Sequence, residues 1–198
     1  LPFYVDLTDC VLGGKLDVLA ELKDLRILTL QQLDLGDQNL AWLAKLKNLE
    51  YLDVTDCVVK GPLVEHLTEL SNLKTLYLTN QTLGSETSKF ARLANLQVLF
   101  LDGTDLNDTG AKAIGTLSGL RFLNVAETKL TIEGVRSLTS LSTLEALLLR
   151  GLPIQGAIEQ INALPNLEIL DASNTDLENK GLELLSQHKT LSRLGIGN

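Results

Sequence analysis

The stretch LEYLDVTDCVV, from Leu49 to Val59, contains the pattern that decides the fold. Its apolar residues alternate with polar or aromatic ones, which is typical of a short strand with one buried face. The same spacing returns in LQVLFLDGTDL (96–106), LRFLNVAETKL (120–130) and LEILDASNTDL (167–177). All four stretches follow L-x-x-L-x-L-x-x-(T/C)-x-L, with another apolar residue in place of some leucines. The chain is therefore predicted to repeat one structural unit.

The leucine that opens each unit recurs at a nearly constant interval. It is found at Leu25, Leu49, Leu73, Leu96, Leu120, Leu144, Leu167 and Leu191. The differences between successive residue numbers are 24, 24, 23, 24, 24, 23 and 24. A further unit begins near residue 2, so we expect a single domain over 1–198 with about eight repeats and a partial ninth.

The second half of each unit has apolar residues three positions apart, as in Leu40, Leu43 and Leu46. This spacing suits a helical turn or a short helix. One such unit cannot bury its own apolar face, whereas stacked units share a continuous core. We expect Phe90 in that core and Trp42 partly exposed on the helical side.

Together these motifs resemble the leucine-rich repeat family over essentially the whole chain. The resemblance implies an α/β fold: a right-handed solenoid, or horseshoe, with a parallel β-sheet on the concave face and helices on the convex face. The repeat tails that contain Gly110, Gly134 and Gly181 are similar to the cysteine-containing or bacterial type, L-T-D-x-G. Members of the family bind very different partners, so the fold alone names no partner.

The chain has two cysteines, and alignment of the units places Cys10 and Cys57 at one position just past the strand. Thr104, Thr128 and Thr175 occupy the same position in other units. The resemblance implies a structural ladder in which these side chains satisfy backbone groups of the turn.

Two units separate the cysteines, and strands lie about 4.8 Å apart, so their Cα atoms should be roughly 10 Å apart. A disulfide needs less than about 7 Å. We therefore predict two buried free thiols. A metal site is not expected either, because the sequence has no C-x-x-C motif and its histidines lie in other segments.

The residues between the strand leucines should point outward on the concave face. Six of the eight aromatic residues occupy such positions: Phe3, Tyr4, Tyr51, Tyr77, Phe100 and Phe122. The predicted apolar patch for a partner consists of Tyr51, Tyr77, Val98, Phe100, Phe122, Ala146 and Leu148. Exposed apolar surface with aromatic anchors usually marks a protein interface. The alternative is that aromatic residues simply suit strands, or that a flanking segment covers them.

Towards the first units the same face becomes acidic. The carboxylates are those of Asp6, Asp9, Glu50, Asp53 and Asp56. A solvated acidic rim is one interpretation, and a docking place for a basic partner segment is the other.

Composition and motifs exclude several classes of function. A formal charge of −8 argues against a duplex nucleic acid, which needs clustered Lys and Arg. No apolar run approaches the roughly 18 residues of a membrane span, so no membrane insertion is expected. The two histidines, His66 and His188, lie in convex-side segments where a catalytic triad is hard to assemble. We expect no enzyme and no cofactor.

The sequence thus predicts a non-catalytic protein–protein interaction module that binds a protein or peptide on its concave face. Two alternatives stay open: the substrate-recognition arm of a larger regulatory enzyme such as a ubiquitin ligase, and a secreted or surface-exposed microbial adhesin or effector.

The chain has no methionine and stops inside the ninth strand. We therefore expect either a piece of a longer chain or self-association through an uncapped C-terminal edge. Unpaired thiols favour a reducing, cytoplasmic compartment and leave secretion open.

Overall fold

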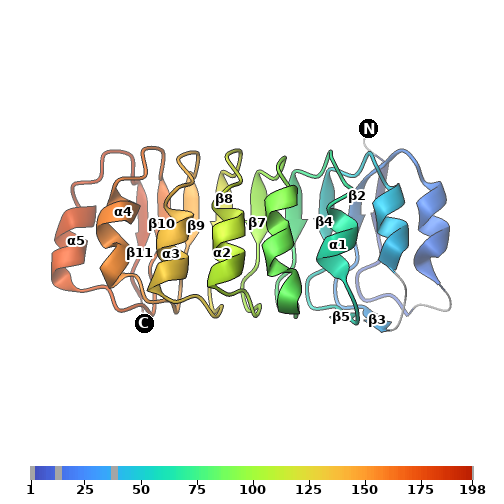
Figure 1. Cartoon of the computed structure of the whole chain (residues 1–198), viewed down its shortest axis with the longest axis horizontal. Helices are drawn as coiled ribbons and strands as arrows, with labels where there is room; N and C mark the ends of the chain where they lie inside the picture. The colour runs from blue at the N-terminus through green and yellow to red at the C-terminus, as the bar shows by residue number, and fades with distance from the viewer. Residues whose placement is uncertain (1–2, 12–14, 37–39, 198) are drawn as a thin grey trace.

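The computed structural model describes residues 3–11, 15–36 and 40–197. Its main feature is a nine-stranded parallel sheet in which the strands of successive units lie side by side throughout (Figure 1). The strands are β1 (Phe3–Asp6), β2 (Leu25–Thr29), β4 (Tyr51–Asp53), β6 (Thr75–Tyr77), β7 (Val98–Phe100), β8 (Phe122–Asn124), β9 (Ala146–Leu148), β10 (Ile169–Asp171) and β11 (Arg193–Gly195). The expected start of the first unit, near residue 2, lies outside the described residues.

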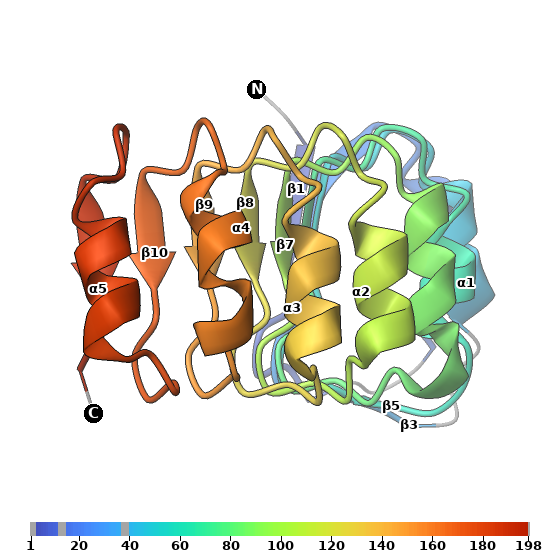
Figure 2. The same ribbon diagram turned by 60° about the vertical axis from the view of Figure 1, so that its left-hand side comes forward.

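Short helices connect the strands. They are η1 (Leu16–Glu21), η2 (Leu40–Lys45), α1 (Leu63–Leu67), η3 (Gly84–Arg92), α2 (Asp108–Ile114), α3 (Ile132–Leu138), η4 (Gln155–Ala157), α4 (Ile158–Asn162) and α5 (Asn179–Leu185), where η denotes a 3₁₀ helix. A small second sheet pairs β3 (Asp34–Gly36) with β5 (Val58–Val59). Figures 1 and 2 show the helices in one row along one side of the main sheet. The predicted parallel sheet with helices on one side is confirmed, and its other side is the open sheet face.

The core is a set of leucine rows that run across the strands. Leu28, Leu52 and Leu76 are paired directly in register, and the same row continues through Leu99, Leu123, Leu147 and Leu170. All seven side chains have no exposed surface. Burying one leucine side chain contributes about 1.5–3 kcal/mol, and in a stacked array each unit shares that burial with its neighbours.

The first eight strands of the main sheet, from β1 to β10, are each followed by a turn that contains one residue with positive φ. These residues are Asp9, Gln32, Asp56, Asn80, Gly103, Glu127, Gly151 and Asn174, with φ between 54° and 78°. Glycine, Asn and Asp tolerate this left-handed conformation best, which explains most of the occupants. The turn also explains the acidic residues at the strand ends. The Asp53 carboxylate accepts a hydrogen bond from the backbone N–H of Thr55 at 2.9 Å. The carboxylates of Asp6 and Asp171 accept the backbone N–H groups of Thr8 and Ser173 in the same way.

An asparagine ladder, not predicted from the sequence, joins the loops that precede the strands. The Nδ2 atoms of Asn48, Asn72, Asn95 and Asn166 donate to carbonyl oxygens 24 or 25 residues earlier, at 2.6–2.9 Å. Each bond satisfies a loop carbonyl of the preceding unit. These bonds are exposed to solvent, so each adds only a modest amount, about 0.5–1.5 kcal/mol, to the contacts between neighbouring units.

The position just past the strand has the hydrogen-bonding residues that the family resemblance implied. The hydroxyls of Thr104, Thr128 and Thr175 each donate to the carbonyl three residues earlier at 2.7 Å. The Cys57 thiol donates to the Leu30 carbonyl of the preceding unit at 2.7 Å. Both cysteines are free, but Cys10 is exposed, so the prediction of two buried thiols is wrong for Cys10. Cys10 lies in the first unit, and a first unit has no preceding unit among the described residues to cover it.

Trp42 is also placed differently from the prediction. It is 4% exposed and belongs to the core, not to the convex surface. Helix η2 is packed between η1 and α1, so its flanks are covered as well as its inner face. Spacing along one helix shows only the inner face, and the stacking of neighbouring units buries the flanks.

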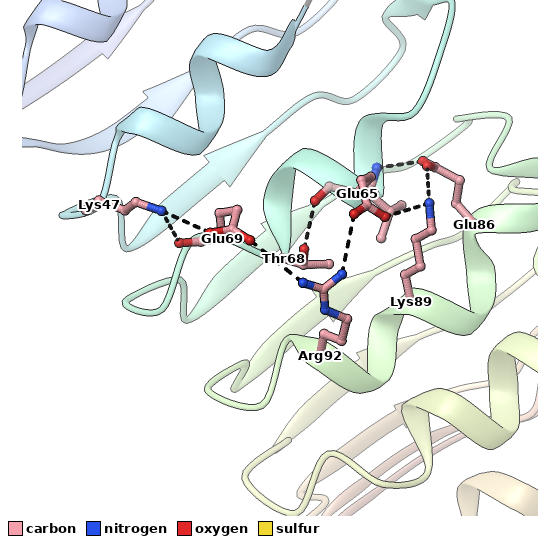
Figure 3. Close-up of polar contacts among 8 residues, drawn as sticks. Lys47, Glu65, Thr68, Glu69, Glu86, Lys89 and Arg92 are labelled. Atoms are coloured by element: carbon pink, nitrogen blue, oxygen red, sulfur yellow. Dashed lines mark hydrogen bonds and ion pairs between the residues drawn. The ribbon is translucent and has the colours of Figure 1, made fainter.

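Ion pairs and hydrogen bonds join the convex helices α1 and η3 (Figure 3). Lys89 on η3 reaches Glu65 on α1 at 2.7 Å and Glu86 at 3.1 Å, and the Glu86 carboxylate accepts the Val64 amide at 2.8 Å. Lys89 holds the pKa of Glu65 below its ordinary value, chiefly through the hydrogen bond between the two side chains. Exposed pairs of this kind contribute little singly, so we regard the network as a supplement to the leucine core.

Three glycines allow adjacent helices to approach closely. A Cβ atom at Gly110 would lie 2.5 Å from Leu106 Cδ1 and 2.7 Å from Thr87 Cβ, an atom of the neighbouring η3. Gly134 and Gly181 face similar obstruction. These are the glycines of the repeat tails, and the three units that contain them have seven-residue α-helices.

We predict that Gly110→Ala destabilises the chain. Overpacking costs about 1–3 kcal/mol, and the better helix propensity of alanine offsets about 0.5–1 kcal/mol of it. Thermal unfolding followed by circular dichroism should show Tm lowered by roughly 2–8 °C. Gly119→Ala is the matched control, because a Cβ there comes no closer than 3.7 Å to another atom. Equal Tm values for the two variants would contradict this packing argument.

The two thiols should differ in reactivity. Burial raises the pKa of Cys57 to about 11, so little thiolate is present near pH 8, whereas Cys10 is exposed. Ellman's reagent should therefore modify one thiol rapidly in the native protein and the second only on unfolding. The Cys10→Ser variant should lose the rapid phase. Two rapid phases in the native protein would show that Cys57 is not protected.

Candidate functional site

A continuous ladder of aromatic rings crosses the open sheet face. We call Tyr51, Tyr77, Phe100 and Phe122 the aromatic ladder. The Tyr77 and Phe100 rings stack with centroids 4.3 Å apart and an angle of 14°, and Phe100 stacks on Phe122 at 5.0 Å and 18°. Tyr51 is tilted by 41° against Tyr77 at 5.5 Å. Such contacts add about 0.5–1.5 kcal/mol per pair beyond area burial, so the rings hold one another in place.

The register of the sheet explains how the ladder forms. Tyr77 on β6 pairs directly with Phe100 on β7, whereas Tyr51 and Phe122 come from the strand position two residues earlier. Both positions point to the open side, because side chains alternate along a strand. The ladder therefore runs across four adjacent strands, and the rings remain half-buried with their outer edges accessible.

The tyrosine hydroxyls lie beside a buried carboxylate. Asp53 is 2% exposed and accepts hydrogen bonds from the Gln31 amide and, at 3.4 Å, from the Tyr51 hydroxyl. Burial, and then the charge of Asp53, raise the pKa of Tyr51 to about 12. The pKa of Tyr77 is raised for the same two reasons. Both tyrosines therefore stay neutral at physiological pH and present hydroxyl groups rather than charges.

Two residues predicted to contact a partner are buried. Asp53 is covered by Gln31, Tyr51 and its own turn, and Ala146 is 2% exposed. The prediction that Asp53 and Ala146 are partner-accessible is wrong, because side chains of adjacent strands are long enough to cover a shorter neighbour. Val98, Phe100, Phe122 and Leu148 are half-buried on the open face, as are Tyr51 and Tyr77.

The remaining acidic residues have bonds within the chain. Asp6 accepts the Tyr4 hydroxyl at 2.7 Å and the Thr8 hydroxyl at 2.6 Å. The Thr8 bonds are the main reason that the pKa of Asp6 is lowered. Glu50 is paired with Arg26 and Lys74, each at 2.8 Å.

Asp56 is the residue with left-handed conformation in its turn, and its carboxylate accepts a hydrogen bond from the side-chain Nδ2 of Asn80 at 2.7 Å. The expected acidic docking rim is thus largely engaged in structural bonds.

A hollow that the sequence did not predict lies next to the aromatic ladder. We call this space, of about 280 Å³, the open-face hollow. It is lined by Gln97, Val98, Arg121, Phe122, Glu145, Ala146, Glu168 and Ile169. Four of these residues are the first after each unit-opening leucine, and four are the second. Aligning the residues that directly follow each unit-opening leucine, in the same way as the outward strand positions, would have placed these residues together in the sequence analysis.

The described residues show neither a metal-binding cluster nor a membrane-spanning helix. Within 3–11, 15–36 and 40–197, no group of three or more His, Cys, Asp or Glu side chains could hold a metal ion. In the same ranges, no helix has the length and hydropathy needed to cross a membrane. His188 has a structural position: its Nδ1 accepts the Leu191 amide at 3.1 Å and its Nε2 lies 3.1 Å from the Leu164 carbonyl.

Comparisons with known proteins give strong matches at the level of structure. No protein-family model matches the sequence. An internalin (inlF) of Listeria monocytogenes superposes with a TM-score of 0.77 at 23% identity, covering 98% of this chain and 54% of the internalin. Internalin C2 of the same organism gives a TM-score of 0.76 at 20% identity, covering 98% of this chain and 80% of that one. At these identities the likeness shows the fold alone.

A match by sequence is partial. Over 108 residues, 52% of this chain, it is 32% identical to adenylate cyclase of Schizosaccharomyces pombe, and this covers 6% of that protein. The chain therefore corresponds to a small part of this relative and to about half of the inlF internalin. A leucine-rich repeat protein of Leptospira interrogans also superposes, with a TM-score of 0.60 at 20% identity, covering 99% of this chain and 60% of that one. With its repeated strands, one-sided row of helices and these structural neighbours, the chain has the leucine-rich repeat fold.

Proposed function

We propose that this chain is a protein-binding module whose open sheet face holds a protein or peptide partner. The observation that carries the proposal is the aromatic ladder. Four half-buried rings lie in one row on the open face of the sheet, with neutral tyrosine hydroxyls at one end. Aromatic anchors on preorganised surfaces are typical of binding hot spots, because they offer large contact area at little cost in conformational entropy.

The charged residues of this face support the same function. Most carboxylates near the ladder are occupied by internal hydrogen bonds or ion pairs, so the accessible part of the face is mainly apolar with polar edges. Apolar centres with polar rims are the usual anatomy of a protein interface. The plant peptide hormone receptor RGFR1, solved in complex with RGF2, has the same fold, with a TM-score of 0.61 at 18% identity over 97% of this chain and 35% of that one.

A second candidate is a recognition segment within a larger regulatory enzyme. The partial match to a fission yeast adenylate cyclase favours it, since that protein contains a related stretch within a much longer chain. In this role the open face would still bind a protein, and the catalytic activity would belong to another part of the longer chain. The bacterial subtype of the repeats, self-association through the C-terminal edge and a secreted microbial role stay predictions.

The test uses peptide selection on the intact chain. Random linear peptides selected against the wild-type protein should bind it, and the double variant Phe100→Ser/Phe122→Ser should weaken their binding by more than about tenfold, as expected for hot-spot residues. Fluorescence anisotropy with labelled peptides gives the Kd, and circular dichroism checks that the variant is folded.

The control variant is Val18→Ser/Val58→Ser, which removes two exposed apolar side chains that are not on the open sheet face. Its affinity for the selected peptides should equal that of the wild type. If the Phe100/Phe122 variant binds the peptides as tightly as the wild type does, the open sheet face is not the binding surface and the proposal is wrong.

A further inference from the structure

The aromatic ladder ends at Phe122, and one side of its last ring faces a small residue. Phe100 on β7 stacks against Phe122 from one side. On the other side, the register partner of Phe122 on β9 is Ala146, which has only a methyl group. In the part of the chain that the structure describes, the stack has no further ring beyond Phe122. A planar group from outside could therefore extend the stack at this end.

The open-face hollow lies at this end of the ladder. Val98, Phe122, Ala146 and Ile169 provide its apolar surface, and its volume is about 280 Å³. Pockets for drug-sized ligands and cofactors are typically about 300–1,000 Å³. The hollow is thus slightly small for such a ligand, and its size suits one side chain of a protein partner.

The polar edge of the hollow carries one uncompensated negative charge. The Arg121 guanidinium donates through Nε to Glu145 Oε1 at 2.7 Å, so these two charges cancel. Glu168 is exposed, and among the described residues its carboxylate has no ion-pair partner. The Glu168 carboxylate is therefore available to a cation.

Arginine is the side chain that suits both the free face of the Phe122 ring and the unpaired carboxylate of Glu168. Its guanidinium is flat and cationic, so it stacks on an aromatic face and pairs with a carboxylate through a fork of N–H groups. A lysine ammonium is a compact point charge without a plane to stack. An aromatic side chain would extend the ladder but would leave Glu168 unpaired. The net charge of −8 also favours a cationic partner.

We propose that the open-face hollow binds an arginine side chain of the partner, stacked on Phe122 and paired with Glu168. This inference rests on the proposed function, since it assigns a chemical preference to the same face. It requires no change in the structure, because the ring, the hollow and the carboxylate are already in place.

The experiment is a titration of the isotopically labelled chain, followed by NMR, with N-acetyl-arginine methylamide as the probe. Resonances of Phe122, Ala146 and Ile169 should shift and saturate. The citrulline counterpart has the same shape without the charge, and the phenylalanine counterpart has a ring without the charge. Both should bind more weakly than the arginine probe.

Glu168→Gln should weaken the arginine probe about two- to fivefold, the range expected for an exposed ion pair, with almost no effect on the citrulline probe. The effect should shrink as salt is added. Glu159→Gln on α4 is the charge-matched control, because it removes one exposed carboxylate from the helical side and should leave the affinity unchanged.

Three results would overturn the inference: equal affinity for the arginine and citrulline probes, tighter binding of the phenylalanine probe, or wild-type affinity of the Glu168→Gln variant. Each of these is separate from a failure of the proposed function. Selected peptides that depend on Phe100 and Phe122 but bind the Glu168→Gln variant normally would retain the binding face and reject the arginine preference.

Discussion

Every unit of this solenoid depends on its neighbours to bury its leucines. A strand of about three residues and a one- or two-turn helix enclose no core of their own, so the apolar side chains are covered only when the next unit is stacked. The leucine rows from Leu28 to Leu170 are the result. The in-register hydrogen bonds of the sheet and the asparagine bonds between loops then fix how far apart the units lie.

This stacking decides which polar residues are structural. The chain turns sharply between a strand and the helical segment that follows it, and the turn contains a residue in the left-handed conformation. A side-chain oxygen at the end of the strand, from Asp53 or Asn124 for example, accepts the backbone N–H two residues further along. Asp53 and Asp56, which suggested an acidic docking surface in the sequence, both serve this turn. The aromatic ladder, by contrast, is required by neither the leucine core nor the turns. Its position on the open side of the sheet is the reason that we propose this face for binding.

Much of the architecture was predictable from the sequence, because it follows from local periodicity. Apolar residues at every second position predicted the strands, and apolar residues three positions apart predicted the helical segments. The interval of 23 or 24 residues between the unit-opening leucines predicted the stacking of units. The outward rows followed from the same alignment, so the four rings of the ladder were assigned to one face. The residues that were misplaced, Cys10, Trp42, Asp53 and Ala146, depend on how neighbouring units cover one another.

The sequence by itself determined the repeat, the strand and helix of each unit and the face on which the aromatic residues lie. All of these depend on the order of residues within one unit. Only the tertiary structure decided that the rings stack, that Ala146 ends the stack beside a hollow, and that Arg121 neutralises Glu145. It also left the Glu168 carboxylate without an ion-pair partner among the described residues. The physical reason is that these contacts join side chains about 24 residues apart, so their distances depend on the stacking between units rather than on any pattern within one.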